Sequence, residues 1–392
     1  MTATDTPIDV RPPFWRDLRV IRLVVQLVAV VVVFGLVWIL GNNLLDELRQ
    51  RNLPTTFDFL DQPTGVNIPD SSFDPASPIR SALLVGIKNT FLLVIVGIPL
   101  VTVFGTLIGV ARLSTNWLVA KAATVYVEAI RNIPPLLIII FVFNAFILRA
   151  LPPPTEAATP LDWFVISNLN IVGPSIATTE GAGVVWFLTL IGVIAAFVVG
   201  YARTRYSERT GHPHHRILWG LAVILFFAVV GYFIMGRPVS ISFPELDGRI
   251  ILGGFGGLGS YFAVLLALVI YTSSHIAEIV RGSILAVPNG QSEASNALAL
   301  SGFQRLRYVI LPQAYRIALP PIINQYLNFT KNTSLAIAIG FSEITLITFQ
   351  AIGNGSPAPQ LILMLMGGYL IFSLTISLIV NYINRRLQLV GR

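Results

Sequence analysis

The sequence predicts an all-α polytopic membrane protein with about eight transmembrane helices. Apolar residues fill 54% of the 392 positions and charged residues only 11%, whereas a soluble domain carries about 25% charged residues. Several apolar runs reach the roughly 20 residues that a helix needs to cross the hydrocarbon core of a bilayer. The chain has no cysteine, which excludes disulfides, zinc–cysteine sites and thiol catalysis.

Eight segments are apolar enough to be predicted as spans. They are residues 20–40, 84–110, 122–149, 184–201, 217–235, 259–280, 317–340 and 361–384. The first is longer than the apolar core of a signal peptide, about 7–15 residues, and no small-residue cleavage pattern follows it. We therefore expect a retained anchor. The third contains Pro134-Pro135, a pair that breaks or kinks a helix.

The basic residues predict the orientation of the chain in the membrane. Most of the 26 Lys and Arg residues fall in the N-terminal stretch, in segments 112–121, 203–216 and 281–316, and in the C-terminal tail. With alternating spans these segments share one side, which the positive-inside rule assigns to the cytoplasm. The net charge of +7 is therefore a topological signal, and we expect no nucleic-acid partner.

No motif in the chain predicts a nucleotide or metal site. The run GGFGGLG at 253–259 has no following Lys-Ser or Lys-Thr, as a phosphate-binding loop requires, and we interpret it as a flexible lead-in to the sixth span. His212, His214 and His215 lie in a polar loop without a nearby carboxylate. This favours a solvated loop over a metal site.

A polar insert, NGQSEASNALALSGFQRLRYVILPQA at 289–314, separates two apolar spans. A Pro-Asn-Gly run at 288–290 predicts a turn, and residues 292–300 are predicted to form a short helix with small side chains along one stripe. Glu293 lies in its first turn, where a carboxylate suits the helix dipole, and Gly302 is expected to end it. Such a small-faced helix is typical of one that inserts into a shallow groove on a partner.

The insert resembles the coupling-loop signature of permease subunits in bacterial ATP-binding-cassette importers. That signature runs E-A-A, three residues, Gly, nine residues, Ile, any residue, Leu-Pro. The corresponding residues are Glu293, Ala294, Ser295, Ala299 in the glycine place, Val309 in the isoleucine place, Leu311 and Pro312. The three departures keep small or β-branched character.

Four flanking runs make the chain similar to the polar amino-acid branch of that family. They are YVEAIRNIPPLL (126–137), HIAEIVRGSILAVPNGQSEA (275–294), VILPQA (309–314) and LNFTKNTSLAIAIGFSEI (327–344). The likeness covers about 80–150 and 258–385. The additional first span and the two spans inserted at 184–235 are similar to one permease of the general L-amino-acid importers.

The resemblance implies a type I importer permease fold with a five-helix core, in the bacterial inner membrane. Four parts are then expected along the chain. They are a cytoplasmic tail, first anchor and periplasmic loop in 1–80, a first core part in 81–150, an insertion with two extra helices and periplasmic loops in 151–258, and a second core part in 259–392 with the coupling loop at 288–312.

The resemblance also implies a transport subunit that is not an enzyme and that forms half of an amino-acid path. A second related permease, two ATP-binding-cassette ATPase subunits and a periplasmic amino-acid-binding protein would complete the importer. ATP and Mg²⁺ would bind to the ATPases, so no cofactor is expected in this chain.

Polar residues at membrane depth are candidates for the path. An ionised side chain near mid-membrane costs about 2.5–3.5 kcal/mol on insertion scales, so it needs a partner or water. The run TKNTS places Lys331, Asn332, Thr333 and Ser334 at this depth. They either line the path and meet the α-carboxylate of an amino acid, or they bridge neighbouring helices.

Two E-x-x-R pairs predict structural ion pairs on single helix faces. Glu128 and Arg131 would brace the break before Pro134, and Glu278 and Arg281 repeat the spacing at the end of the sixth span. A G-x-x-x-G pattern at 105–109 predicts either a close-packing face of the second span or a chance match.

Two other classes of function remain as alternatives. A self-contained ion-coupled amino-acid transporter or channel would explain the spans and Lys331, although the sequence lacks the visible internal repeats that are common in secondary transporters. An intramembrane enzyme would need a nucleophile and base at depth, for which His275 beside Ser273 and Ser274 is the only candidate.

Overall fold

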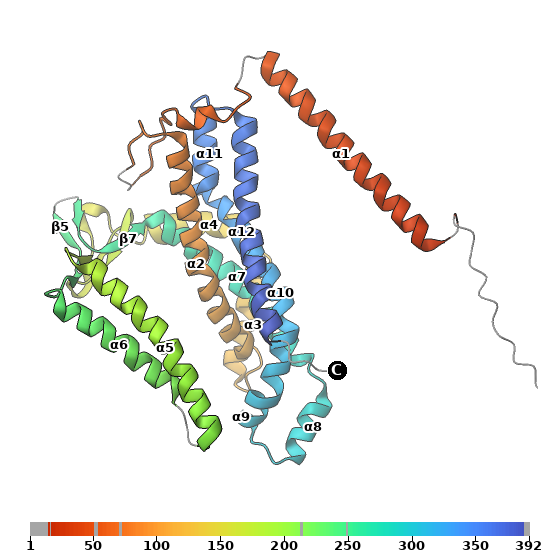
Figure 1. The fold of residues 1–392 in the computed structure, drawn as a ribbon, viewed down its shortest axis with the longest axis vertical. Helices are drawn as coiled ribbons and strands as arrows, with labels where there is room; N and C mark the ends of the chain where they lie inside the picture. The colour runs from red at the N-terminus through yellow and green to blue at the C-terminus, as the bar shows by residue number, and fades with distance from the viewer. Residues whose placement is uncertain are drawn as a thin grey trace, which may run out of the picture.

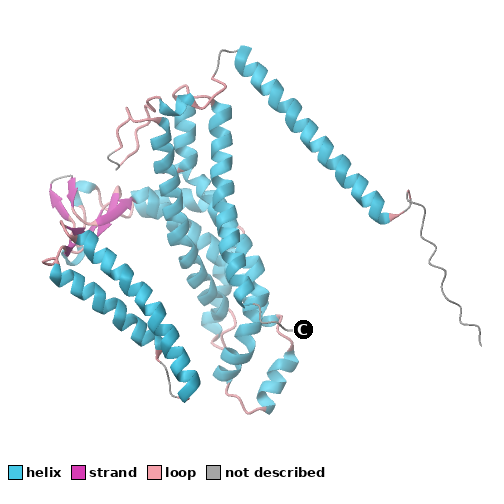
Figure 2. Ribbon diagram, in the orientation of Figure 1, coloured by secondary structure: helices cyan, strands magenta, loops and turns pink. Residues whose placement is uncertain are grey.

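The computed structural model describes residues 15, 17–50, 54–69, 73–211, 215–247 and 250–387. The expected cytoplasmic tail before Trp15 lies outside these residues, and so do His212 and His214 of the predicted solvated loop. The fold is mainly helical, as predicted (Figure 2).

Six helices of the described chain are long and apolar enough to cross a membrane. They are α1 (Leu18–Gln50), α2 (Ile79–Ala111), α5 (Ala182–Thr210), α6 (Arg216–Ile234), α7 (Gly259–Leu285) and α12 (Ala358–Leu387). Two bent helix pairs bring the number of candidate spans up to eight. The eight predicted segments therefore correspond to six single helices and two bent pairs.

The third predicted span is not one straight helix. It divides into α3 (Trp117–Arg131) and α4 (Pro135–Phe141), which continues as the π-helical turn η2 (Val142–Leu148), with a bend of 105° between them. Pro134 has no N–H for the helical ladder, and a residue before proline is disfavoured in the α conformation. The chain therefore leaves the helix after Arg131, and Pro135 starts the next one.

The seventh predicted span is also broken. Helix α9 (Gly302–Arg305), the π-helical turn η5 (Leu306–Ile310), α10 (Leu311–Asn332) and the 3₁₀ turn η6 (Thr333–Ile339) follow one another. Gly340, with φ of +72°, ends this run, and α11 (Ile344–Gly353) continues at 47° to it. A left-handed residue interrupts the helical ladder, and glycine adopts that conformation at little cost.

The core lies where α2, α7 and α10 meet. Its fully buried side chains include Leu93 and Val101 of α2, Leu268 and Ile276 of α7, and Phe329 of α10. The G-x-x-x-G pattern forms the contact between α2 and α7. A β-carbon on Gly105 would lie 2.6 Å from Cβ of Ile276, and one on Gly109 would lie 2.7 Å from the Ala277 carbonyl oxygen. The predicted close-packing face is thereby confirmed.

The insertion forms an α5–α6 hairpin beside the central bundle (Figure 1). Its connections contain seven short strands, paired antiparallel in the orders β1-β2-β7, β3-β4 and β5-β6. The strands are β1 (Val165–Ile166), β2 (Asn170–Gly173), β3 (Ser175–Thr178), β4 (Val239–Ser242), β5 (Glu245–Asp247), β6 (Ile250–Leu252) and β7 (Phe255–Leu258).

The interpretation of 253–259 as a flexible lead-in was wrong. Residues 255–258 are strand β7, paired with β2. A β-carbon on Gly256 would lie 2.2 Å from the Ile171 carbonyl oxygen, so the glycine allows the two backbones to approach. Glycine in a strand often marks such a close approach.

The two ends of the bundle carry different segments (Figure 1). Helices α8 (Asn289–Ala297) and α9 lie at the same end as the α2–α3 connection and the tip of the α5–α6 hairpin. At the other end, segment 54–69 packs through Phe59 and Val66 against Ile347 of α11 and Leu361 of α12. The segments rich in basic residues thus gather at the α8–α9 end.

Helix α1 lies apart from the bundle (Figure 1). None of the residues in its most apolar stretch is buried. The helix is also longer than the predicted span, since it continues past residue 40 to Gln50. An apolar helix exposed on all sides needs an apolar environment to cover it. The membrane supplies that environment.

Candidate translocation site and coupling loop

A polar cavity of about 200 Å³ lies between α4, α7 and α10. Its lining residues are Pro135, Tyr271, Thr272, His275, Gln325, Asn328 and Asn332. Pro135 is the first residue after the bend between α3 and α4, so the broken third span forms one wall. No carboxylate lines this cavity.

Helix α10 places three carboxamides on one face. Gln325, Asn328 and Asn332 are three and four residues apart, a spacing that stacks side chains along a helix. Within the described part of the chain, none of the three has a protein hydrogen-bond partner for its carboxamide. Each carboxamide offers donors and an acceptor, and since Asn328 is exposed and Gln325 and Asn332 are half-buried, these groups can bind water or a ligand in the cavity. The cavity is therefore suited to water or a polar ligand.

The orientation of His275 is set by its own helix. Nδ1 lies 3.1 Å from the Tyr271 carbonyl oxygen, which can only accept, so Nδ1 carries the proton. In a neutral ring Nε2 is then an acceptor. The imidazole also packs against the Tyr271 ring at 4.6 Å between centroids. This arrangement leaves a hydrogen-bond acceptor on a residue that lines the cavity.

The Ser274 hydroxyl lies 3.3 Å from Nδ1 of His275, but a nitrogen that carries the proton cannot accept one from the hydroxyl, so this contact is not a nucleophile–base pair. The Ser274 hydroxyl donates to the Tyr271 carbonyl oxygen at 2.6 Å, and Ser273 contacts the Tyr126 hydroxyl at 2.9 Å and the Ile270 carbonyl oxygen at 3.1 Å. General-base activation requires the nucleophile to donate its proton to the base. Both serines are committed to other groups, which argues against the enzyme alternative.

The four residues predicted for the path do not act as one group. Asn332 lines the cavity. Lys331 is exposed and forms no ion pair with the described residues. Thr333 is buried and donates to the Thr330 carbonyl oxygen at 2.7 Å, and Ser334 donates to the Lys331 carbonyl oxygen at 2.8 Å. The hydroxyls of Thr333 and Ser334 are thus occupied by backbone groups.

Sequence reasoning missed Gln325, Asn328 and His275 as lining residues. The spacing of Gln325, Asn328 and Asn332 along one predicted span was a usable signal, because uncharged carboxamides on one face of an apolar helix require a partner. His275 carried no comparable signal for a cavity, since the carboxamides opposite it come from α10, a different helix.

The coupling loop contains one well-formed helix and a reversal. Glu293, Ala294 and Ser295 lie in α8, which ends at Ala297 and not at the predicted residue 300. The helix begins at Asn289, inside the predicted turn at 288–290, so the prediction that Glu293 lies in its first turn was wrong. Ala299, in the glycine place of the signature, has φ of +55°. An L-residue pays a conformational cost there that glycine does not. The backbone thus explains why the signature has glycine at this position.

Gly302 starts a helix and does not end one. Ser301 is the N-cap of α9, and its side chain and that of Gln304 form a capping box, which satisfies backbone N–H groups at the helix start. Leu311 and Pro312 are the first residues of α10. Pro312 follows directly after the π-helical turn η5; proline has no N–H for the helical ladder, and such single π-helical turns interrupt the regular ladder.

Two side-chain hydrogen bonds hold the loop together. Arg305 donates to Asn296 at 2.8 Å, and Gln313 at the start of α10 donates to Gln291 of α8 at 3.0 Å. Leu298, 75% exposed, and Phe303, 68% exposed, project apolar surface from the same loop. The loop therefore combines a fixed shape with an uncovered apolar face.

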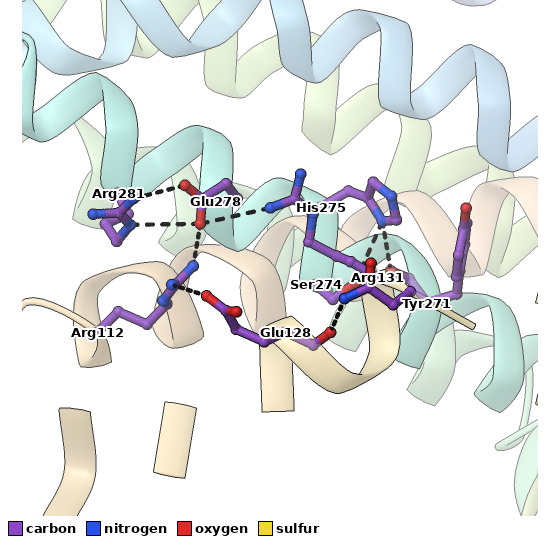
Figure 3. Close-up of polar contacts among 9 residues, drawn as sticks. Arg112, Glu128, Arg131, Tyr271, Ser274, His275, Glu278 and Arg281 are labelled. Atoms are coloured by element: carbon purple, nitrogen blue, oxygen red, sulfur yellow. Dashed lines mark hydrogen bonds and ion pairs between the residues drawn. The ribbon is translucent and has the colours of Figure 1, made fainter. Parts of the chain in front are cut away.

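A cluster of charged side chains joins three helices near the α8–α9 end (Figure 3). Glu278 of α7 pairs with Arg281 at 2.7 Å, as its spacing predicts, and also with Arg112 at the end of α2. Arg131 of α3 lies 3.8 Å from Glu278, and Glu128 lies 3.5 Å from Arg112.

The predicted direct pair of Glu128 with Arg131 does not form. Each side chain instead reaches an opposite charge on another helix, Arg112 for Glu128 and Glu278 for Arg131. Pairing along one helix contributes only about 0.2–0.5 kcal/mol, so a nearby charge on a packed helix competes readily. Spacing in sequence cannot reveal those competing partners.

Comparison with known proteins connects these features. Residues 97–389 match the family model described as binding-protein-dependent transport system inner membrane component. The general L-amino acid transport system permease protein AapQ of Rhizobium johnstonii is 38% identical over 94% of this chain and 92% of its own length.

Two further relatives cover a similar share of the chain. The putative amino-acid ABC transporter permease protein YhdX of Escherichia coli is 38% identical, with 94% of both chains aligned. The glutamate/glutamine/aspartate/asparagine transport system permease protein BztB of Rhodobacter capsulatus is 35% identical, with 96% of both aligned. Among solved structures, an amino acid ABC transporter crystallised with histidines covers 79% of this chain at 20% identity and a TM-score of 0.43.

The matched residues contain both the cavity and the α8–α9 loop, and relatives of near-equal length align over almost the whole chain. The chain therefore belongs to the family of binding-protein-dependent transport system inner membrane components, as a multi-pass permease that is not itself an enzyme.

Proposed function

We propose that this chain is one permease subunit of an ATP-driven amino-acid importer, and that the cavity between α4, α7 and α10 is its part of the translocation path. The observation that carries the proposal is the set of three carboxamides without protein partners at Gln325, Asn328 and Asn332. The relatives named as amino-acid permeases support amino acids as the substrate class.

The cavity has the chemistry to meet an amino acid. The α-carboxylate accepts hydrogen bonds and the α-ammonium donates them, and carboxamides do both. The acceptor nitrogen of His275 suits the ammonium group. Lys331 follows Asn328 by three residues on α10 and is exposed, so its ammonium group is available to the carboxylate.

The exposed side of α10 supports a second permease subunit as partner. Asn324, Asn328 and Lys331 are exposed in the middle of an apolar bundle, and polar side chains at this depth face protein or water and not lipid. A related permease covering this side would close the path between two subunits. This chain would then form half of the path.

The α8–α9 loop would couple the permease to a separate ATPase. Leu298 and Phe303 expose apolar surface on a loop with a fixed shape, as a docking element requires. In the complete importer two ATPase subunits hold ATP and Mg²⁺. A binding protein delivers the amino acid at the α11 end, and the α8–α9 end and both termini lie in the cytoplasm at the bacterial inner membrane.

The test is co-expression with the neighbouring transport genes, followed by purification through this chain. We expect an ATPase to be recovered and ATP-dependent amino-acid uptake after reconstitution with the binding protein. Glu293→Arg combined with Ala294→Arg should remove the ATPase from the complex. Glu245→Arg in strand β5, an exposed reversal of the same charge, is the control and should leave it bound.

Two results would contradict the proposal. An ATPase that remains bound to the Glu293→Arg/Ala294→Arg variant would show that α8 is not the docking helix. Uptake driven by an ion gradient in liposomes that contain this chain alone would instead support a self-contained transporter.

A further inference from the structure

The ion-pair cluster links the helix that leads to the coupling loop with the helix that leads to the cavity. Arg112, Glu128, Arg131, Glu278 and Arg281 come from the end of α2, from α3 and from α7 (Figure 3). Only the side chain of Arg112 is deeply buried, with 6% exposed. Packing alone does not explain why this charged cluster lies beside the proposed path.

Helix α7 reaches both the cavity and the coupling loop. His275 lines the cavity, and Glu278 follows it by one helical turn. The helix ends at Leu285, and α8 begins at Asn289 after a short link. A displacement of α8 is therefore applied to the end of α7, about two helical turns beyond Glu278.

Helix α3 reaches the cavity from the other side of the cluster. It ends at Arg131, and the bend that follows leads to Pro135, which lines the cavity. Val127 is its one buried residue. The position of Pro135 thus depends on the contacts that hold α3 against α7 and also on α4 itself, whose Ile138 and Ile139 are buried in the core together with α7.

Those contacts lie at two heights on α3. The Tyr126 hydroxyl donates to the Ile270 carbonyl oxygen at 2.7 Å, which holds the helix against α7. One turn later, Glu128 contacts Arg112 and Arg131 contacts Glu278. The Tyr126 hydroxyl also contacts Ser273 at 2.9 Å, and Val127 beside it is buried. The ion pairs one turn later add a second point of attachment, which restricts rotation of α3 about the first.

We propose that the two ion pairs made by α3, Glu128 with Arg112 and Arg131 with Glu278, make the α3–α4 bend follow α7, so that a displacement of the coupling loop reshapes the cavity. These four are positioning residues. The inference rests on the proposed function, because it assumes that α8 docks on an ATPase.

Ion pairs suit a joint that moves. Exposed or half-exposed pairs break and re-form without leaving a cavity, whereas an interlocked apolar contact cannot shift without a loss of packing. The Glu128 side chain is 67% exposed and that of Arg131 is 42% exposed, so water can replace either partner during the movement.

The decisive experiment releases α3 alone. The double variant Glu128→Gln/Arg131→Gln keeps the net charge and leaves the contacts of Glu278 with Arg112 and Arg281 intact. In the complete importer we expect normal assembly and ATP hydrolysis stimulated by the binding protein. Uptake per ATP hydrolysed should fall by about tenfold, inside the roughly 5- to 150-fold range of coupling between sites.

The matched control is Asp61→Asn/Arg80→Gln, which removes an exposed 2.9 Å ion pair at the α11 end and should leave this ratio unchanged. The conservative pair Glu128→Asp/Arg131→Lys, which keeps both charges, should restore most of the uptake. A purely structural role predicts that hydrolysis and uptake fall together.

An unchanged ratio in the Glu128→Gln/Arg131→Gln variant would overturn the inference, as would a parallel fall of hydrolysis and uptake. If that variant does not assemble, Arg131→Gln alone removes only the 3.8 Å contact. A wild-type value of uptake per ATP hydrolysed in Arg131→Gln would likewise overturn the inference. Failure of the wild-type complex to hydrolyse ATP would instead count against the proposed function.

Discussion

A β-carbon built on Gly97 of α2 would lie 2.1 Å from Cζ of the Phe329 ring on α10. The ring is completely buried, so it has no room to turn away. Phe329 is adjacent in sequence to Asn328, and the close approach of α2 fixes the rotation of α10 about its axis. That rotation decides which side chains of α10 line the cavity.

Replacement of Gly97 by alanine should therefore disrupt the bundle. Overpacking a well-packed core costs about 1–3 kcal/mol, and the absence of space around Phe329 favours the upper part of that range. We expect a lower midpoint of thermal unfolding in detergent for Gly97→Ala. Gly200→Ala in α5, where no atom lies within 4 Å of the added carbon, should leave the midpoint unchanged or raise it.

Replacement of Ala299 by glycine should stabilise the coupling loop. The left-handed conformation costs an L-residue about 1–2 kcal/mol, and the greater freedom of glycine in the unfolded chain offsets about 0.4–1 kcal/mol. Slower amide hydrogen exchange across 289–305 is the expected result. Ala297→Gly, in the helical conformation of α8, should speed exchange, and faster exchange in Ala299→Gly would contradict the strain argument.

Loss of a carboxamide from the cavity should weaken binding of the transported substrate. A hydrogen bond contributes about 0.5–1.5 kcal/mol, so Asn332→Ala should raise the KM of ATP-dependent uptake by roughly 2- to 10-fold. Ser334→Ala is the control, because the Ser334 hydroxyl is committed to the Lys331 carbonyl oxygen. Equal KM values for the two variants would remove Asn332 from the path.

Glu343 should be important for stability, since its fully buried carboxylate joins α11 to α12. It accepts hydrogen bonds from the Tyr369 hydroxyl at 2.8 Å, the Thr345 hydroxyl at 3.1 Å and the Leu346 N–H at 2.9 Å. Removing it leaves buried donors unpaired at about 1–3 kcal/mol and deletes an N-cap worth about 1 kcal/mol.

Glu343→Ala should thus lower the unfolding free energy by roughly 2–4 kcal/mol, and Tyr369→Phe by about 1 kcal/mol. Chemical denaturation in mixed micelles is a suitable measurement. The control is Glu156→Ala, an exposed position where the change should stay within about 0.5 kcal/mol. If Glu343→Ala and Glu156→Ala change the unfolding free energy by the same amount, the hydrogen bonds of Glu343 do not stabilise the protein.

The spans could be located from the sequence because a membrane-crossing helix must satisfy its own backbone and present apolar side chains over a fixed length. That requirement is local, and all eight segments correspond to helices. The bends at Pro134 and Gly340 were harder to predict from the sequence. Proline indicates a break, but its angle of 105° is set by how α4 packs against α7.

The candidate site could be predicted only in part from the sequence. Glu293, Leu311 and Pro312 could be placed in one loop because they lie close together in the chain. Asn332, a candidate for the path in one of two readings, lines the cavity. His275 was not among the path candidates, because its place beside α10 depends on the packing of α7. The pairing of Glu128 with Arg112 could not be predicted for the same reason, since it depends on how α2 and α3 pack together.

The sequence alone thus determined the helical class, the number of candidate spans and the family, because hydropathy, charge distribution and a contiguous motif are properties of neighbouring residues. The tertiary structure decided which polar side chains share the cavity, which charges pair, and that the connections of the insertion form strands. Those outcomes depend on the rotation and close approach of helices distant in the chain, as at Gly97 and Phe329, and no local pattern records them.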